Sequence, residues 1–382
     1  MTACIRVATS PGEAQIAVVE DNRLLDFCLW RPGAPDGVGD VHRGRVIALV
    51  PAMAGAFVAL ADAEGFLPDS EGAKGLTAGT ILTVRVTRAA QGNKGPRLSV
   101  RGTQWEKARE GSDKGVDGAA MTRSGPAALL WRGPNPMTRL ATLYPDAPIA
   151  VDDAGVAAGL RLGGRVSVVA TVFEEEVAEA IDALTRSVVD LSGGASLSIW
   201  PTPALVAIDV DAGGALAVAG GARARHEALN RAVVPAVAEQ IRLRNLSGGI
   251  VVDLAGLSPR KRAALGPDFV AALANDSLHP RFLGFTALGL AEIVRSRVHP
   301  PLHELLAGPL PAGLAALRAV MAAFSQDPRG MPAVRAHPAV VSALQSDSAA
   351  LPDLARRTGR EITLRSDPSL PATAWVLEKD HG

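Results

Sequence analysis

The chain has 382 residues, and 39 Lys and Arg balance 39 Asp and Glu, so its formal net charge is zero. This balance excludes a protein that coats polyanions over its whole surface, but it is compatible with a local basic groove. The length predicts about two or three domains, and a 48% apolar content is sufficient for their cores. Two cysteines, Cys4 and Cys28, exclude a disulfide framework and a cysteine-rich zinc site.

Targeting signals are not evident in the sequence. The N-terminal residues MTACIRVATS lack the apolar stretch of a signal peptide. No run of about eighteen uncharged apolar residues occurs, which is the length that a membrane helix needs. We therefore expect a cytoplasmic protein without a membrane span.

The first hundred residues predict strands. Residues 3–30 read as two or three strands, and the Gly/Pro/Asp-rich stretch 31–40 reads as a connector. Several short strands separated by glycine turns follow in 41–101, a pattern typical of a small barrel such as an OB-fold. Two interpretations are open for Phe57 and Phe66, which either fill the barrel core or offer stacking faces to RNA bases. The cations that would contact phosphates in the second case are Arg43, Arg45, Arg85 and Lys94.

The remaining chain mixes helices and strands. The polar residues 102–124 predict a linker or a short helix with a loop. Helices are predicted over 173–188, over 223–244 with a kink at Pro235, and over 289–298, which carries Arg295 and Arg297. The tail 334–378 predicts two helices followed by the strands EITLRSD and TAWVLE.

Two carboxylates end two predicted strands. The apolar run 204–208 leads to Asp209, and the run 250–252 leads to Asp253. Carboxyl ends of neighbouring strands can meet at one edge of a sheet, where ligands bind in α/β folds. Asp211 points to the same side if the strand continues. Magnesium prefers such oxygen ligands, and it would activate water and neutralise charge on a phosphodiester. The alternative is that these aspartates are ordinary turn and cap residues.

Other catalytic motifs give no comparable signal. His299 and His303 have an i, i+4 spacing, but Pro300 and Pro301 lie between them and a third zinc ligand is not evident. We find no glycine-rich phosphate loop, nucleophile elbow or Cys-x-x-Cys pair. A zinc site is therefore not predicted.

The assembled pieces resemble the ribonuclease E/G family. The resemblance rests on the barrel segments RGRVIALVPAMAGAFVAL and GNKGPRLS, then AIDVD (207–211), QIRLRNLSGGIVVDL (240–254) and GLAEIVRSRVHPPL (289–302). The segment DALTRSVVDLSGGASLSI and the C-terminal sequence extend it over nearly the whole chain in order. The RLRNLSGGIVVD block is its most specific part.

The resemblance implies a fold and an activity. It implies an α+β multidomain protein in which an OB-fold barrel interrupts a ribonuclease H-like subdomain, followed by a deoxyribonuclease I-like catalytic subdomain. It also implies that Asp209 and Asp253 bind a catalytic Mg²⁺, or Mn²⁺ in its place, and that single-stranded RNA is cut to 5′-phosphate and 3′-hydroxyl ends. Phe57, Phe66 and Lys94 match barrel positions that contact RNA, and we add Arg43, Arg45 and Arg297. The expected boundaries are 1–36 and 125–195 for the ribonuclease H-like subdomain, 37–101 for the barrel, 102–124 for the linker, 196–306 for the catalytic subdomain and 307–382 for the C-terminal helices and strands.

The sequence departs from the family pattern in several places. Asp211 replaces an asparagine, which adds a third acid to the expected metal ligands. Gly213 to Val218 replace basic residues, and Thr286, Ala287 and Leu288 replace Ser-Arg-Phe, so an arginine of the site is missing. Cations that face the phosphate stabilise the negative charge that develops during cleavage. Because some of them are missing here, the alternative function is that of a catalytically weak or inactive RNA-binding relative.

Two further departures are deletions. The paired cysteines that share a zinc ion between protomers are absent, so we expect any oligomer to form without zinc. Residues 102–124 are too few to build the family's sensor for a 5′-monophosphate. We therefore expect an endoribonuclease that needs no 5′-monophosphate.

Overall fold

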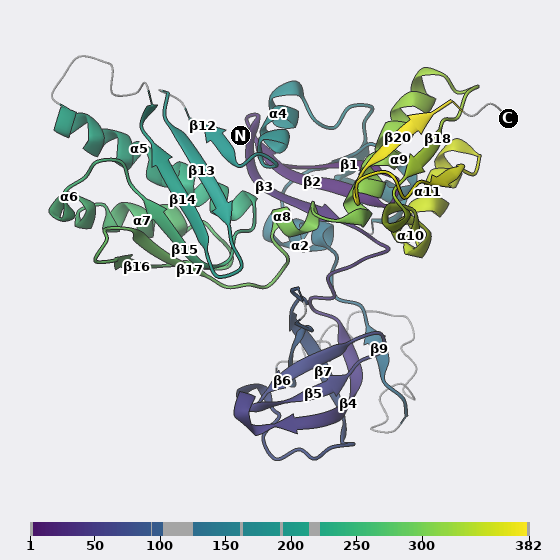
Figure 1. The fold of residues 1–382 in the computed structure, drawn as a ribbon, viewed down its shortest axis with the longest axis horizontal. Helices are drawn as coiled ribbons and strands as arrows, with labels where there is room; N and C mark the ends of the chain where they lie inside the picture. Colours follow the sequence, from purple (N-terminus) through teal and green to yellow (C-terminus); the bar gives the residue numbers. More distant parts are fainter. Residues whose placement is uncertain are drawn as a thin grey trace. The chain divides into compact units, whose positions relative to one another are not determined.

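The computed structural model describes residues 3–92, 94–101, 125–160, 163–191, 194–213 and 222–379. The expected linker 102–124 lies outside the described residues. Contacts divide the chain into two units (Figure 1). The barrel unit comprises Asp36–Asn135 and Arg297–Pro300, and the main unit comprises Met1–Pro35, Pro136–Ser296 and Pro301–Gly382.

The barrel unit contains a closed five-stranded barrel with the strand order β5-β6-β8-β7-β4, in which β4 also pairs with β5. Its strands are β4 (Val41–Val50), β5 (Gly55–Ala59), β6 (Glu64–Pro68), β7 (Ile81–Arg88) and β8 (Arg97–Ser99). Strands β6 and β8 are parallel, and the other pairs are antiparallel. The short helices η1 (Pro51–Met53) and η2 (Asp69–Glu71) follow β4 and β6. Alternate residues such as Ala56, Val58, Leu67 and Leu98 fill the interior, and this arrangement confirms the expected OB-like barrel.

Strand β9 (Ala128–Trp131) joins the barrel sheet by pairing with β4. We expected residues 125–195 to belong to the ribonuclease H-like subdomain, so the structure differs there. Asp40 explains the placement, because its carboxylate accepts a hydrogen bond from the Gly133 amide at 2.7 Å and forms an ion pair with Arg132. These contacts hold the segment after β9 against the start of β4.

The first sheet of the main unit has the order β11-β10-β1-β2-β3. Strands β1 to β3 are antiparallel, and β10 and β11 continue the sheet in parallel with β1. One face packs on α2, and the other packs on α4 and α8. The elements are β1 (Cys4–Ser10), β2 (Glu13–Glu20), β3 (Arg23–Trp30), α2 (Pro136–Leu143), β10 (Ile149–Val151), α3 (Ala154–Gly159), η4 (Gly163–Arg165), β11 (Val166–Val168), α4 (Glu175–Ala183) and α8 (Leu302–Leu305).

The second sheet of the main unit has the order β12-β13-β14-β15-β17-β16. Helices α5 and α7 cover one of its faces through a large apolar core (Figure 1). The strands are β12 (Val188–Asp190), β13 (Ser196–Pro201), β14 (Val206–Asp211), β15 (Gly248–Asp253), β16 (Arg281–Phe285) and β17 (Ala291–Arg295). The helices are α5 (Ala222–Leu243), which contains Pro235, α6 (Pro259–Ala263) and α7 (Gly266–Leu273).

The helix predicted over 289–298 is wrong, because β17 occupies Ala291–Arg295. Ala291, Ile293 and Arg295 are buried, while the residues between them are partly exposed. This period of two belongs to a strand with one covered face. The apolar run is too short to distinguish a strand from a helix by spacing alone.

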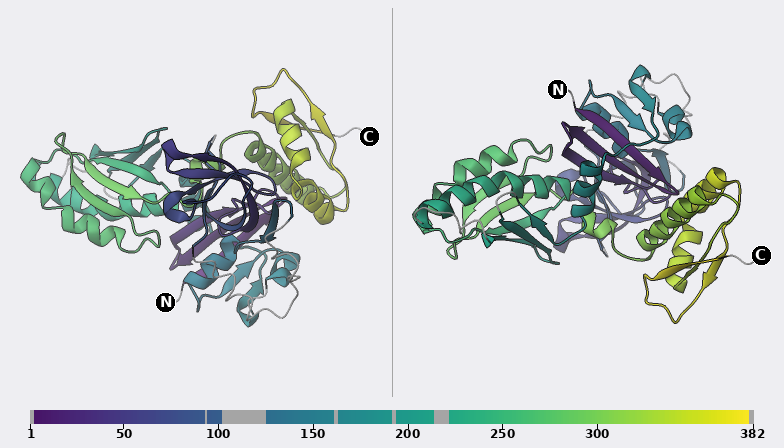
Figure 2. Two further views of the ribbon diagram at one scale, coloured as in Figure 1. Left: turned by 90° about the horizontal axis from the view of Figure 1, so that it is seen from below. Right: turned by 90° about the horizontal axis from the view of Figure 1, so that it is seen from above.

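A third, smaller sheet lies near the C-terminus with the order β19-β18-β20. It consists of β18 (Ala333–Ala336), β19 (Leu364–Ser366) and β20 (Trp375–Glu378), which confirm the two predicted C-terminal strands. Helices α9 (Pro309–Gln326), α10 (Pro338–Ser346) and α11 (Ala350–Thr358) share its core, and Figure 2 shows α9 alongside these strands. Among the described residues, no helix is long and apolar enough to cross a lipid bilayer.

Candidate active site and nucleic-acid surface

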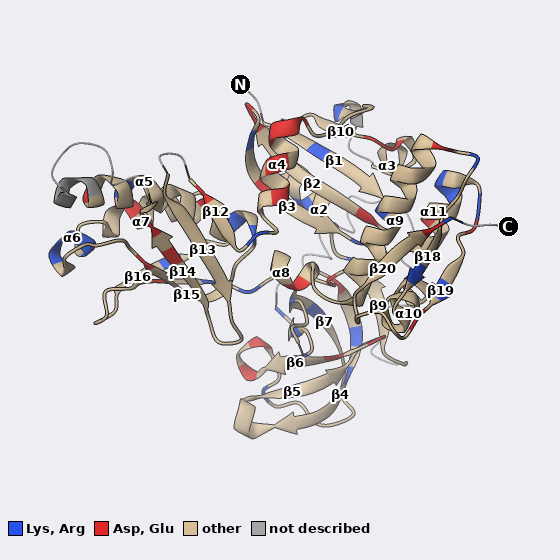
Figure 3. Cartoon of the chain, turned by 45° about the horizontal axis from the view of Figure 1, so that its top comes forward, with Lys and Arg blue, Asp and Glu red and all other residues tan. Residues whose placement is uncertain are grey.

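Asp209 and Asp253 lie side by side on β14 and β15. The two strands are parallel, and these two residues are partners in their register. Ile208 and Val252 are buried against the helices, so the alternation of a strand directs both exposed carboxylates to the opposite face. We call this the open face, and Figure 3 shows acidic residues in red on its strands. The structure thus brings the two predicted metal ligands together.

Asp211 is also exposed and stands two residues beyond Asp209 on the same strand face. Its Oδ1 accepts a hydrogen bond from the Gly213 amide at 2.9 Å, which makes it part of the turn after β14. Within the described ranges, no group of three or more His, Cys, Asp or Glu is arranged to hold a metal ion. Two carboxylates with water suit Mg²⁺, which usually takes one or two from the protein. Residues 214–221, which hold most of the substituted Gly213–Val218 segment, lie outside the described part of the chain.

Helix α6, which follows Asp253 in the chain, carries a cluster of cations. It carries Arg260, Lys261 and Arg262. The Arg262 guanidinium donates a hydrogen bond to the Leu288 carbonyl at 3.2 Å. That carbonyl belongs to the loop before β17, and β17 begins beside the end of β15 because Val252 pairs with Ala291. Sequence reasoning missed these cations, although they lie only seven to nine positions after Asp253.

Asn230 of α5 connects the helix to the turn after Asp253. Its Nδ2 donates to the carbonyls of Ala255, at 2.8 Å, and His226, at 2.6 Å. Its Oδ1 accepts from the Ala255 amide at 3.1 Å. Asn230 is 0% exposed, so it satisfies both backbone groups of Ala255 away from water. The sequence contained no signal for this role beyond a polar residue within an apolar helix stripe.

The segment Arg242–Asn245 (RLRN) supports the architecture. Arg242 donates to the Leu25 carbonyl at 2.9 Å, and Arg244 donates to the Arg186 carbonyl at 2.6 Å. Burial lowers the pKa of Arg244 to about 10. Asn245 accepts from Arg295, whose guanidinium forms a buried ion pair with Asp276 at 2.7 Å. The segment that is most specific in sequence therefore joins the two large sheets of the main unit.

The two phenylalanines of the barrel form one outward pair. Phe57 and Phe66 are partners on β5 and β6, and their rings meet edge to face at 5.6 Å. Both are partly exposed, while the neighbouring Val58 and Leu67 are 0% exposed. These two strands correspond to the second and third of an OB-fold, the face that binds oligonucleotides. The phenylalanines are therefore not the main barrel core.

A row of arginines continues this pair across the barrel. Phe66 is the register partner of Arg97 on β8, and Arg97 is the partner of Arg88 on β7. Burial, together with the positive charges of Arg97 and Arg297, lowers the pKa of Arg88. We call Phe57, Phe66, Arg97 and Arg88 the barrel row. The sequence analysis did not single out Arg88 and Arg97, because their proximity to Phe66 arises only from the pairing of β6, β7 and β8.

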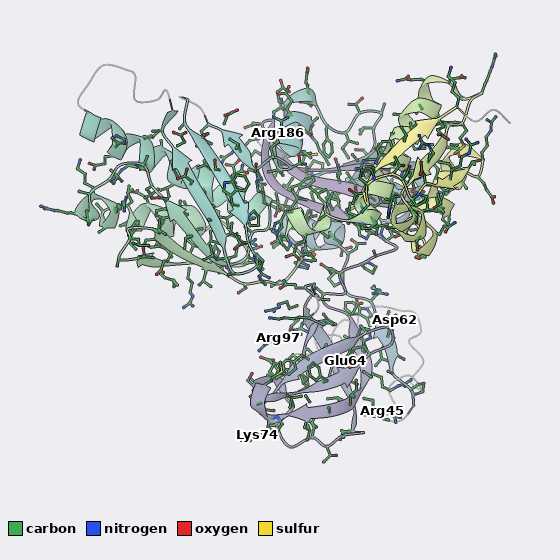
Figure 4. The ribbon with its side chains drawn as sticks, in the orientation of Figure 1. Arg45, Asp62, Glu64, Lys74, Arg97 and Arg186 are labelled. Carbon is green, nitrogen blue, oxygen red and sulfur yellow. The ribbon has the colours of Figure 1, made fainter. Side chains whose placement is uncertain are left out.

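The other predicted RNA-binding residues occupy varied positions in the barrel unit. Lys94 is exposed in the β7–β8 connection, where its backbone bridges Gln91, and Gln91 accepts from Arg297 at 3.0 Å. Arg43 donates to the Pro126 carbonyl at 2.8 Å. Arg45 is exposed on β4, and Figure 4 shows it toward a different end of the barrel from Arg97. Lys94 and Arg297 therefore lie with the barrel row, and Arg45 does not.

Comparison with known proteins identifies related sequences. The model of the "Ribonuclease E/G family" matches residues 164–298, which include Asp209 and Asp253. Ribonuclease E of Nostoc sp. is 35% identical over 136 residues, covering 35% of this chain and 19% of that protein. Ribonuclease E of Synechocystis sp. is 34% identical over 126 residues, covering 32% of this chain and 18% of that protein. Ribonuclease G of Escherichia coli K12 is 23% identical over 411 aligned residues, covering 81% of this chain and 83% of that protein.

Proposed function

The chain belongs to the ribonuclease E/G family, and we propose that it is a metal-dependent endoribonuclease acting on single-stranded RNA. The observation that carries the proposal is the pairing of Asp209 with Asp253 on neighbouring parallel strands, with both carboxylates on the open face. The matches to ribonucleases E and G support RNA as the substrate class for this pair.

Asp209 and Asp253 would hold the metal ion, and Mg²⁺ fits their hard oxygen ligands. When bound, the ion supplies an activated water nucleophile and neutralises charge on the phosphodiester. The chain's own residues fix the geometry. The strand register sets the separation of the carboxylates, and Asn230 holds the turn that follows Asp253. The products carry 5′-phosphate and 3′-hydroxyl ends.

The barrel row supplies RNA binding. Phe57 and Phe66 offer aromatic faces on which bases stack, and Arg97 and Arg88 place two cations directly beside them. Aromatic faces combined with a cationic groove bind single strands with little dependence on sequence. Lys94 and Arg297 extend the positive charge. This arrangement supports an unpaired RNA strand as the substrate.

The subdomain assignments also remain part of the proposal. Three antiparallel strands extended by two parallel strands support a ribonuclease H-like sheet for β1–β3, β10 and β11. The mixed sheet β12–β17 with its helix-covered face supports a deoxyribonuclease I-like catalytic subdomain. The enzyme acts without a 5′-monophosphate, and its protomers are not joined by zinc.

The second candidate function is an RNA-binding relative with little catalysis. Asp211 adds negative charge on the strand that bears Asp209, and Thr286-Ala287-Leu288 lack the expected arginine. Arg262 favours the active enzyme, because its guanidinium contacts the same loop at Leu288. Helix α6 therefore supplies a cation, Arg262, to the loop in which the expected arginine is missing.

The discriminating experiment is a cleavage assay. Purified protein is incubated with an unstructured RNA and Mg²⁺ or Mn²⁺, beside an Asp253→Asn variant. We expect cleavage by the unmodified protein and loss of cleavage in the variant. Cleavage that persists unchanged in Asp253→Asn would overturn the assignment, and binding without cleavage by the unmodified protein would establish the second candidate.

A further inference from the structure

Trp200 is a large aromatic side chain left exposed on the open face of the catalytic sheet. It is 55% exposed, although the neighbouring Ile199 is 1% exposed and packs into the core. Trp200 lies on β13, where its register partner is Ala207 of β14. Tryptophan is usually highly buried in folded proteins. Here its ring is exposed and therefore available to a ligand on this face.

The strand register places Trp200 next to the paired carboxylates. Asp209 is two residues beyond Ala207 on β14, so Trp200 and Asp209 are diagonal neighbours on the same face. Diagonal neighbours are about 7–8 Å apart and within reach of an aromatic side chain. Ala207 pairs with Val251 of β15, which is itself two residues before Asp253. An apolar row of Trp200, Ala207 and Val251 thus adjoins the row that holds Asp209 and Asp253.

We propose that Trp200 is a stacking platform for the nucleobase adjacent to the phosphodiester held at Asp209 and Asp253. This rests on the proposed function of the site. Among the described residues, the open face carries five acids and one cation at its β16 edge, so its charge is negative and it repels an RNA backbone except where a cation intervenes. The acids are Asp190, Asp209, Asp211, Asp253 and Glu292, and the cation is Arg281. A flat apolar ring attracts a base independently of that charge, because every base offers a π-face. Trp200 positions the strand and takes no part in the chemical step.

The test compares Trp200→Ala, Trp200→Phe and Val188→Ala in the full chain. Val188 is the matched control, because it is also apolar, 45% exposed and on the same face. RNAs carrying a single 2-aminopurine at successive positions are mixed with each protein in a stopped-flow instrument, and fluorescence is followed before cleavage. Cleavage kcat/KM and the melting temperature are measured on the same samples.

We expect quenching at one position by the unmodified protein and its loss in Trp200→Ala. Trp200→Phe should keep most of the kcat/KM, because a phenyl ring still stacks on a base. The kcat/KM of Trp200→Ala should fall by about 5- to 150-fold, the range that loss of one base stack gives. Val188→Ala should match the unmodified protein, and all melting temperatures should agree. An abasic nucleotide at the quenched position should remove the difference between Trp200→Ala and the unmodified protein.

Unchanged quenching and unchanged kcat/KM in Trp200→Ala would overturn the proposal while leaving the ribonuclease assignment intact. A change in self-association of Trp200→Ala with unchanged quenching would also overturn it, because the ring would then serve a protein contact. Absence of cleavage by the unmodified protein is the separate failure of the proposed function. Quenching at a single position can still be scored in that case, so the two failures are distinguishable.

Discussion

Asn230 shows how one buried amide can support the site without facing the substrate. Its side chain bonds to the amide and carbonyl of Ala255, two residues after Asp253. Removal would leave these two groups without a partner in a partly buried region, and each such group, when fully buried, costs about 1–3 kcal/mol. The turn after Asp253 would then relax, and the position of the carboxylate with it.

We therefore expect Asn230→Ala to lower the free energy of unfolding and also to raise the Mg²⁺ concentration needed for half-maximal cleavage. Urea unfolding measures the first effect. Mg²⁺ titration of the cleavage rate, at a temperature where the variant stays folded, measures the second. Arg231→Ala is the matched control on α5, because Arg231 makes only a 3.5 Å ion pair with Asp268 in a partly exposed position. If the unfolding free energy falls while the Mg²⁺ dependence stays unchanged, Asn230 has no role in positioning the site.

Asp26 of β3 has a raised pKa, and this predicts that the free energy of unfolding falls as the pH rises. Burial raises its pKa, against the opposing effects of the Phe27 amide, which donates to it at 2.8 Å, and of Arg242 and Arg139. A raised pKa means that the folded protein binds the proton more tightly than the unfolded chain does. Stability is therefore lost as pH rises from the ordinary aspartate pKa, about 3.9, through the raised value.

Asp26→Asn should remove this loss, since the amide oxygen can still accept from Phe27 and carries no charge. We expect the variant to be more stable than the unmodified protein at pH 7, with the difference shrinking toward pH 4. Urea unfolding at several pH values measures it. A difference that is independent of pH would show that the Asp26 carboxylate does not control stability in this range.

At the scale of elements, the positions of most short strands could be predicted from the sequence, as could the alternation of buried and exposed side chains along them. The barrel strands and the two strands that carry Asp209 and Asp253 followed from β-branched runs bounded by glycine. Their register did not follow, because pairing depends on contacts between segments far apart in the chain. The helix predicted over 289–298 is a strand instead, because an apolar run as short as Ala291–Arg295 fits either element by spacing alone. The cross-strand neighbours of Arg88 and Arg97 also appear only once β7 and β8 are paired.

The barrel row makes a prediction about salt. Each phosphate contact contributes about −0.7 to the slope of log binding constant against log salt for a single strand. Arg97→Ala should therefore flatten the slope by about that amount, while Phe57→Ala should weaken binding with little change in slope. Lys74→Ala is the matched control, because Lys74 is an exposed cation elsewhere on the same barrel (Figure 4). Equal slopes for Arg97→Ala and the unmodified protein would remove Arg97 from the RNA surface.

At the scale of the whole molecule, the residues that we propose for RNA binding and those that we propose for metal binding lie in different regions of a neutral chain. The net charge of zero gave no sign of RNA binding, because it sums 39 basic and 39 acidic residues over the whole chain and does not show where each kind gathers. The family resemblance supplied the link that composition could not. The barrel unit carries stacking rings and cations, and the main unit carries the paired carboxylates. Each part follows from strand pairing within its own sheet.

The short stretch 102–124 leads to a prediction about RNA ends. An enzyme without a 5′-monophosphate sensor should cut matched 5′-hydroxyl and 5′-monophosphate RNAs at similar rates. Initial rates on two RNAs that differ only at this end provide the measurement. A preference of many-fold for the monophosphorylated RNA would contradict this expectation, and it would require a phosphate-binding site elsewhere in the chain.

We propose that Asp209 and Asp253 together hold the metal that supports RNA cleavage. Single-turnover cleavage of an unstructured RNA, measured across Mg²⁺ concentrations, tests this proposal. Loss of a group behind a metal ligand typically costs about 10–100-fold, so loss of a ligand itself should cost at least about 100-fold. We expect this loss in both Asp209→Asn and Asp253→Asn. Asp190→Asn, which removes the same charge from the same face, should cleave normally. Cleavage by Asp209→Asn or Asp253→Asn at the unmodified rate and Mg²⁺ dependence would contradict the claim.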